Sequence, residues 1–380
     1  MGKSTEVKLV DRYIFHLGYE PSLDGLRGIS ILSVLGFNGN IPFLRGGFVG
    51  VDIFFVLSGF LITVLLVQEY QRTSGIRLPA FYFRRALRLL PALFVVMLAS
   101  VAYALLFQAD DKASLTLKGV LYTFFYAANW AQVPPNPPGI GALSHAWSLS
   151  VEEQFYIVWP LMLIMLLKLK SKSIGLSILA LLIAISIFLN VWFWHAHAPF
   201  LRMYFGTDTR ANEILIGCFA ALVLCWGLLQ HSNRLKWVLH SAAVMSLAAL
   251  FFAFFGFRPN EWFVYNGGFA ALSIITAILI ADLVLFPSLL SRCFEFAPLV
   301  WIGKISYGLY LWHFPILEAS KKLFEGRMSF FLYTLTGMVV SLLAATASYY
   351  LIERPLLGLR RRHNVRINGT HFVVGSASNA

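Results

Sequence analysis

Residues 46–66 read GGFVGVDIFFVLSGFLITVLL, an apolar run long enough to cross the hydrocarbon core of a bilayer. Asp52 is the one charged residue within it. A charged side chain at the centre of a membrane helix costs about 3 kcal/mol, so it persists mainly where it lines a polar path or a site. A second block, LDGLRG at residues 23–28, brings Asp24 and Arg27 into another apolar run. The two blocks indicate a membrane protein with a reaction or a passage in its interior.

The composition of the 380-residue chain is that of a membrane protein, with 58% hydrophobic residues and a mean hydropathy of +0.72. The net charge of +12 would suit either a nucleic acid or an anionic membrane surface as partner. The basic residues fall in loops between apolar runs, which favours the membrane and predicts no nucleic-acid binding. The cysteines form no C-x-x-C pair, so neither a disulfide framework nor a zinc site is indicated, and we expect no metal.

Apolar windows of membrane-spanning length predict an all-α integral membrane bundle of about ten transmembrane helices. The longest predicted loop is 108–142, where the prolines between 134 and 138 exclude a helix. The predicted helices cover 22–40, 47–68, 88–107, 144–167, 174–194, 211–229, 237–256, 267–286, 303–319 and 329–352.

The distribution of basic residues predicts the orientation of the bundle. If ten helices cross the membrane in alternating directions, the segments on the same side of the membrane as the N-terminus hold about twice as many lysines and arginines as those on the other side. Basic residues favour the cytoplasmic side, and an even number of helices returns the chain to the side on which it began, so we expect both termini in the cytoplasm. We expect residues 1–20 to form a cytoplasmic N-terminal segment, 21–356 the transmembrane domain and 357–380 a cytoplasmic polar tail. The first segment lacks the features of a cleaved secretory signal. No internal repeat is evident, which disfavours a transporter built from inverted halves.

A series of motifs in a fixed order carries a resemblance to a known family. The motifs are LDGLRG (23–28), GGFVGVDIFF (46–55), LSGFLIT (57–63), FRRALR (83–88), HAWSLSVEEQFY (145–156), DTR (208–210), SYGLYLWH (306–313) and ERP (353–355). From about residue 20 to residue 356, the chain resembles the acyltransferase-3 family.

This resemblance implies a multi-pass enzyme of the bacterial inner membrane. Such proteins move an acyl group, commonly acetyl, from cytoplasmic acyl-CoA to a hydroxyl of a surface glycan or glycolipid. The partners implied are therefore acyl-CoA, most simply acetyl-CoA, the glycan or glycolipid acceptor, and membrane lipid. The sequence does not indicate the oligomeric state.

The family motif of the first helix is an arginine, ten residues and a histidine. Here Arg27 matches, but Asn38 occupies the histidine position. The two side chains share a helix face, roughly 16 Å apart along the axis. In the family the histidine would act as general base or acyl relay, and an amide cannot, because it has no basic nitrogen.

Two explanations of Asn38 stay open. It is either a near-isosteric substitution that disables the enzyme, or the mark of a natural protein that has lost or relocated its base. We favour the first, because the other motifs are intact, and we expect little or no acyl transfer by this chain.

Two carboxylates are candidates for chemistry near position 38. Asp52 is predicted at a similar depth, where it could orient an imidazole, or it could be a buried partner for a neighbouring helix. Glu152 lies seven residues after His145, so the two would share a helix face. It could hold an arginine such as Arg27, position the acceptor, or serve only in structural pairing.

Arg85 and Arg88, with Arg84 beside them, are predicted at the cytoplasmic start of the third helix. An Arg-x-x-Arg pair places two guanidiniums on one face, which suits the phosphates of CoA. The alternative is topological, since basic residues in an inside loop set the orientation.

Three further residues are assigned to the acceptor side: His145, Arg210 and His313. Alternatively Arg210 and His313 are interfacial anchors and caps, and His313 could also be a substitute base for position 38.

The rival to an enzyme is a transporter or flippase for a glycolipid or an acyl group, and a third possibility is a catalytically dead homologue. Binding of acyl-CoA would discriminate, because a lipid transporter has no reason to bind it.

Overall fold

The computed structural model describes residues 15–133, 139–229 and 232–356, and in these ranges the chain is helical without β-strands. The predicted polar tail, most of the predicted N-terminal segment and the prolines of 134–138 lie outside them. By length and composition, seven helices of the described part could cross a membrane. They comprise α2 (Val49–Thr73), α3 (Leu78–Phe107), α5 (Trp147–Lys168) with the 3₁₀ turn before it, α6 (Lys172–His195), α9 (Asn233–Gly256), α10 (Phe269–Leu285) with the π-turn before it, and α14 (Phe330–Ser348) with the π-turn after it.

The other three predicted segments are also helices. They are α1 (Pro21–Asn38), α8 (Thr207–Cys225) and α13 (Ser306–Phe324). Each carries charged side chains in its sequence, as expected of helices that line a polar interior rather than face lipid. The structure thus contains a helix at each of the ten predicted positions, and the number that spans the membrane stays a prediction.

One helix of substantial length was not predicted. α4 (Asp110–Phe124) occupies part of the segment 108–142, which the sequence analysis assigned to a loop. Its first turn holds Asp110, Asp111 and Lys112, so no apolar window reveals it. The remaining elements are short: α7 (Phe200–Phe205), α11 (Leu289–Phe294), α12 (Ala297–Lys304), the 3₁₀ turns η1 (Trp130–Gln132) and η2 (Gly141–Ala146), and the π-turns η3 (Val264–Gly268) and η4 (Tyr349–Glu353).

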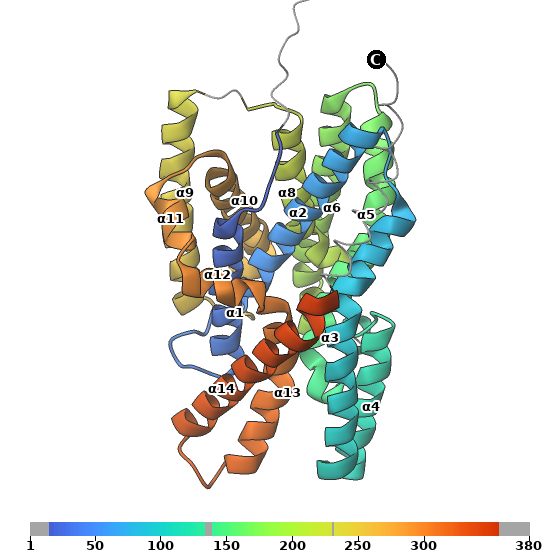
Figure 1. Cartoon of the computed structure of the whole chain (residues 1–380), viewed down its shortest axis with the longest axis vertical. Helices are drawn as coiled ribbons and strands as arrows, with labels where there is room; N and C mark the ends of the chain where they lie inside the picture. Colours follow the sequence, from blue (N-terminus) through green and yellow to red (C-terminus); the bar gives the residue numbers. More distant parts are fainter. Residues whose placement is uncertain (1–14, 134–138, 230–231, 357–380) are drawn as a thin grey trace, which may run out of the picture.

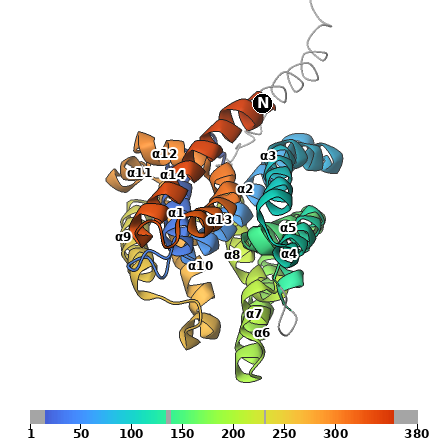
Figure 2. The same cartoon turned by 90° about the horizontal axis from the view of Figure 1, so that it is seen from below.

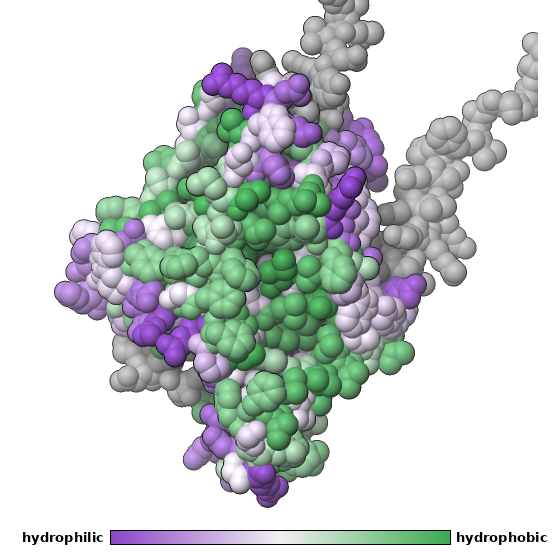
Figure 3. Space-filling model, turned by 90° about the vertical axis from the view of Figure 1, so that its left-hand side faces the viewer, coloured by the Kyte–Doolittle hydropathy of each residue, from purple (hydrophilic) through white to green (hydrophobic). Residues whose placement is uncertain are grey.

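Several of the connections between helices lie at two opposite ends of the molecule (Figure 1). The α2–α3 and α5–α6 connections lie at the top, and the α3–α4 and α13–α14 connections lie at the bottom. This agrees with the predicted alternation of loops. A broad hydrophobic band covers the middle of the face shown in Figure 3, with hydrophilic side chains at its upper and lower ends and also at its left edge. Such a band is what a lipid environment requires.

The central helices α1, α2 and α8 lie side by side (Figure 2), and glycines let helices of the bundle approach closely. A Cβ on Gly47 would lie 2.1 Å from the carbonyl oxygen of Ser33 in α1, and one on Gly46 would lie 1.8 Å from that of Ala253 in α9. Gly50 is similarly pressed against Ser30. The glycines of the N-terminal block therefore serve close helix packing.

Candidate functional site

The first of two cavities, the arginine cavity, has a volume of about 270 Å³ and lies between α1, α2, α3, α5 and α13. Its polar lining is rich in guanidinium and hydroxyl groups, and its apolar lining comes mainly from α2. The polar lining residues are Arg27, Ser58, Arg85, Arg88, Ser148, Glu152, Tyr156, Ser306, Tyr307 and Tyr310.

Two of the three arginines predicted on α3 line this cavity. Arg85 and Arg88 are one helical turn apart, and the Arg85 guanidinium lies 3.6 Å from the centre of the Tyr156 ring. Arg84, turned by about 100° on the helix, forms an ion pair with Glu69 of α2 at 2.8 Å and does not line the cavity. The predicted phosphate-binding set is therefore reduced to Arg85 and Arg88.

Glu152 is the one carboxylate in the cavity lining. It accepts a hydrogen bond from Ser58 Oγ at 2.8 Å. Arg27, the expected partner of Glu152, instead forms its ion pair with Asp24 at 3.7 Å, one turn away on α1. The cavity thus holds the guanidiniums of Arg27, Arg85 and Arg88 against one carboxylate, and this excess of positive charge favours an anionic ligand.

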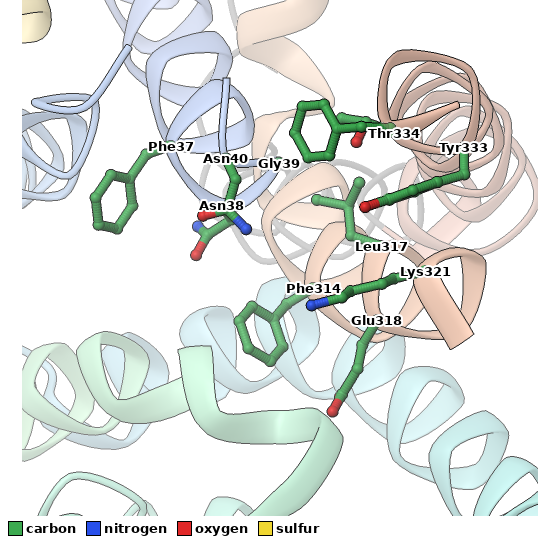
Figure 4. Close-up of a pocket in the computed structure, with 11 residues that line it drawn as sticks. Phe37, Asn38, Gly39, Asn40, Phe314, Leu317, Glu318, Lys321, Tyr333 and Thr334 are labelled. Atoms are coloured by element: carbon green, nitrogen blue, oxygen red, sulfur yellow. The ribbon is translucent and has the colours of Figure 1, made fainter. Parts of the chain in front are cut away.

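The second cavity, here called the Asn38 cavity, has a volume of about 300 Å³ and lies between α1, α13 and α14 (Figure 4). In Figure 4, Lys321 and Tyr333 reach toward the space beside Asn38 and Phe314, and Glu318 extends away from Asn38. The residues that line it are Phe37, Asn38, Gly39, Asn40, Phe314, Leu317, Glu318, Lys321, Phe330, Tyr333 and Thr334.

A cluster of two buried histidines and two half-buried side chains connects the two cavities. We call it the central cluster, and it consists of Asn38, His145, Tyr310 and His313. Tyr310 lines the arginine cavity, and its hydroxyl donates to the carbonyl oxygen of His145 at 2.6 Å. His313 Nδ1 lies 2.6 Å from the carbonyl oxygen of Tyr310, and His313 Nε2 lies 3.2 Å from Nδ2 of Asn38. A continuous path of contacts therefore runs from one cavity to the other.

His145 and Glu152 do not lie on the same α-helix. Helix α5 begins at Trp147, and His145 belongs to the 3₁₀ turn Gly141–Ala146, which is wound more tightly than an α-helix. The His145 ring stacks on Phe314 at 5.3 Å and lies edge-on to His313 at 5.2 Å. The two residues thus contribute to different parts of the site.

Asp52 and Arg210 form an ion pair between α2 and α8, and Arg210 Nε lies 3.1 Å from Glu213 Oε1. The Asp52–Arg210 pair is almost fully buried, and neither residue lines either cavity. The hydrogen-bonded partner of Asp52 is thus Arg210 and not residue 38, and Arg210 is an interior residue rather than an interfacial anchor. Among the described residues, no group of three or more His, Cys, Asp or Glu side chains is placed to hold a metal ion.

The contact between Asn38 and His313 joins residues 275 positions apart, so helical periodicity could not reveal it. A partial signal was present in the motif SYGLYLWH. Tyr310 and His313 are three residues apart, which places both on the same side of a helix. Tyr310 was not among the predicted site residues, although the centre of its ring lies 5.4 Å from those of both His145 and His313 in the structure.

Comparison with known protein families shows to which family the chain belongs. The sequence pattern of a family described as an acyltransferase domain matches residues 20–350. The chain belongs to the acyltransferase-3 family. The resemblance noted in the motifs is thereby confirmed over almost the whole described chain.

Three similar proteins from bacteria are named as O-acetyltransferases, one of them as putative. The chain is 35% identical over 360 residues to a putative peptidoglycan O-acetyltransferase of Bacillus subtilis, covering 90% of this chain and 55% of the relative. It is 35% identical over 353 residues to a peptidoglycan O-acetyltransferase of Listeria monocytogenes, covering 89% and 56%. An O-acetyltransferase of Staphylococcus aureus is 35% identical over 346 residues, with 89% and 57% covered. The chain thus spans a little over half the length of these relatives. No solved structure shows significant similarity to it.

Proposed function

We propose that the chain is a membrane O-acyltransferase that moves an acetyl group from acetyl-CoA to a hydroxyl of a cell-wall glycan. The observation that carries this proposal is the pair of cavities joined by the central cluster, one rich in arginine and the other lined by aromatic and amide side chains. The names of the relatives support peptidoglycan as the acceptor. A glycolipid is the alternative acceptor.

The arginine cavity fits an acyl-CoA in its chemistry. Buried guanidiniums bind phosphate by charge-assisted hydrogen bonds, and Arg85 Nε has no hydrogen-bond partner among the described residues. The apolar residues of α2 suit the pantetheine arm. A volume of about 270 Å³ is at the small end of ligand sites, so we expect the arm to enter and the nucleotide to stay near Leu17 and Gly18, which also line the cavity.

The Asn38 cavity fits a sugar. Aromatic rings such as Phe314 and Tyr333 offer a flat apolar surface to a pyranose, and Asn38, Asn40 and Lys321 offer hydrogen bonds to its hydroxyls. If the basic loops are cytoplasmic and about ten helices span the bacterial inner membrane, this cavity lies on the outer side. The arrangement would let a cytoplasmic donor meet an external acceptor at the central cluster.

Acyl transfer needs a group that takes the proton of the acceptor hydroxyl. The amide of Asn38 cannot do so. The sequence therefore predicts little transfer, unless another member of the central cluster accepts that proton. A transporter, or a homologue that binds without turnover, remains the alternative if acyl transfer is not observed.

The donor assignment is tested by acetyl-CoA binding to the purified protein. We expect Arg88→Gln to weaken binding at least tenfold, because it removes a buried positive charge from the cavity. The matched control is Arg84→Gln, four positions before it in sequence, whose side chain pairs with Glu69 outside the cavity. We expect this control to bind within about twofold of the unchanged protein, since a partly exposed ion pair contributes little. If neither the unchanged protein nor either variant binds acetyl-CoA, the donor assignment is wrong and the transporter reading takes its place.

A further inference from the structure

We propose that His313 is the general base of this chain, so that the protein transfers acyl groups although position 38 carries an amide. This inference rests on the proposed function and names the residue that performs its proton transfer. It is carried by the position of the His313 ring, by its tautomer and by the contact of its Nε2 with Asn38, a residue that lines a cavity.

The position of His313 is between the two cavities. Its side chain is fully buried, and its neighbours on α13 are Tyr310, which lines the arginine cavity, and Phe314, which lines the Asn38 cavity. A base at this point lies where a hydroxyl from one side would meet a thioester from the other.

The hydrogen bonds of His313 fix its tautomer. A carbonyl oxygen can only accept, so the 2.6 Å contact with the Tyr310 carbonyl requires a proton on Nδ1. The neutral ring then has its lone pair on Nε2. Nδ2 of Asn38 donates to the carbonyl oxygen of Val34 at 3.1 Å, which fixes the orientation of the amide and leaves its other N–H for His313 Nε2 at 3.2 Å. The basic nitrogen therefore points toward Asn38.

Asn38 is the side chain between that nitrogen and the Asn38 cavity. It is partly exposed and lines the cavity, so a rotation of its amide would uncover Nε2. A sugar hydroxyl in the cavity can replace the Asn38 N–H as donor to the same lone pair. Asn38 is thus a positioning residue, which holds the imidazole in the basic tautomer until the hydroxyl arrives.

The resulting step balances in atoms and electrons. The hydroxyl oxygen attacks the carbonyl carbon of the acyl thioester while its proton moves to His313 Nε2. The carbon–sulfur bond then breaks, and the thiolate takes the proton from the imidazolium. The products are an O-acyl ester and free CoA thiol, and His313 returns to its neutral form.

Other candidate bases fit less well. His145 packs against the rings of Tyr310, His313 and Phe314, but the histidine that contacts Asn38 of the cavity lining is His313. Glu152 is engaged by Ser58 in the arginine cavity. Glu318 lines the Asn38 cavity but is exposed and extends away from Asn38 (Figure 4), so it is the rival that the experiment must address.

The test compares variants of the purified full chain, using release of free thiol from acetyl-CoA with a soluble peptidoglycan fragment as acceptor. Glutamine at position 313 can place an amide oxygen near the place of Nε2, so His313→Gln keeps an acceptor for Asn38 and removes only the basicity. We expect His313→Gln to lower kcat at least 100-fold and to leave the Kd for acetyl-CoA within about threefold. The retained binding shows that the variant is folded. The exposed His195→Gln is the matched control and is expected to leave both quantities unchanged.

Several results would overturn the assignment. Turnover that survives His313→Gln, or that is lost in Glu318→Gln, places the base elsewhere. An inert unchanged chain beside an active Asn38→His variant returns the base to position 38. If acetyl-CoA binds to no variant, or binds without turnover in any of them, the proposed function fails together with the base. The failure of the inference alone is thus distinguishable, because acyl transfer is then still observed, either by a chain without His313 or by the Asn38→His variant.

Discussion

At the scale of single residues, the neighbours of Asp52 decide what this carboxylate does. It is paired with Arg210, and the guanidinium is also surrounded by aromatic rings, with the centre of the Phe269 ring 3.8 Å away. Glu213 shares the same guanidinium. A buried charge that loses its partner is strongly destabilising, because its desolvation is no longer compensated. The contacts therefore favour a structural role that joins α2 to α8.

This role predicts a loss of stability from Asp52→Asn. We expect the free energy of unfolding to fall by about 2–4 kcal/mol, measured by thermal or denaturant unfolding in detergent. The control is Asp208→Asn, which breaks the partly exposed pair with Arg202 and should cost about 1 kcal/mol or less. Unchanged stability with a large fall in kcat would contradict this account and return Asp52 to the catalytic role that the sequence suggested.

At the scale of elements, the packing of α2 on α8 depends on two glycines. A Cβ on Gly59 would lie 1.9 Å from the carbonyl oxygen of Ile214, and one on Gly217 would lie 2.1 Å from that of Val56. Neither neighbour is a flexible side chain, so the helices themselves would have to separate. This close approach holds Asp52 and Arg210 in register.

We therefore expect Gly59→Ala to destabilise the protein by about 1–3 kcal/mol and to lower the yield of monodisperse protein in detergent. Gly75→Ala is the control, because a Cβ there would meet nothing within 4 Å. Equal yield and equal thermal stability in the two variants would show that the α2–α8 contact is looser than described.

The helices also show how much of the fold could be predicted from the sequence. Apolar windows located helices at the ten predicted positions, because each is dominated by apolar residues over most of its length. They missed α4, whose first turn is charged. The spacing of Arg85 and Arg88 predicted that both side chains lie on one face of the helix, and both line the arginine cavity. Arg84 lies on another face of α3, because neighbouring residues of a helix are about 100° apart. The Asn38–His313 contact could not be predicted, because periodicity describes one helix at a time and not which helices meet.

At the scale of the whole molecule, the two cavities and the central cluster make a route through the bundle. The arginine cavity is lined from α1, α2, α3, α5 and α13, and the Asn38 cavity from α1, α13 and α14. α1 and α13 are common to both and supply Asn38, Tyr310 and His313 of the central cluster. The account therefore requires that donor and acceptor approach from different sides.

The most direct test is a transfer assay in proteoliposomes with the two substrates separated by the membrane. Acetyl-CoA labelled in the acetyl group is supplied outside, and soluble peptidoglycan fragments are enclosed inside. We predict that label accumulates as O-acetyl ester on the enclosed fragments, and that His313→Gln abolishes this accumulation. If acetyl-CoA is consumed but the enclosed acceptor stays unlabelled, while acceptor added on the donor side is acetylated, transfer does not pass through the bundle and the account is wrong.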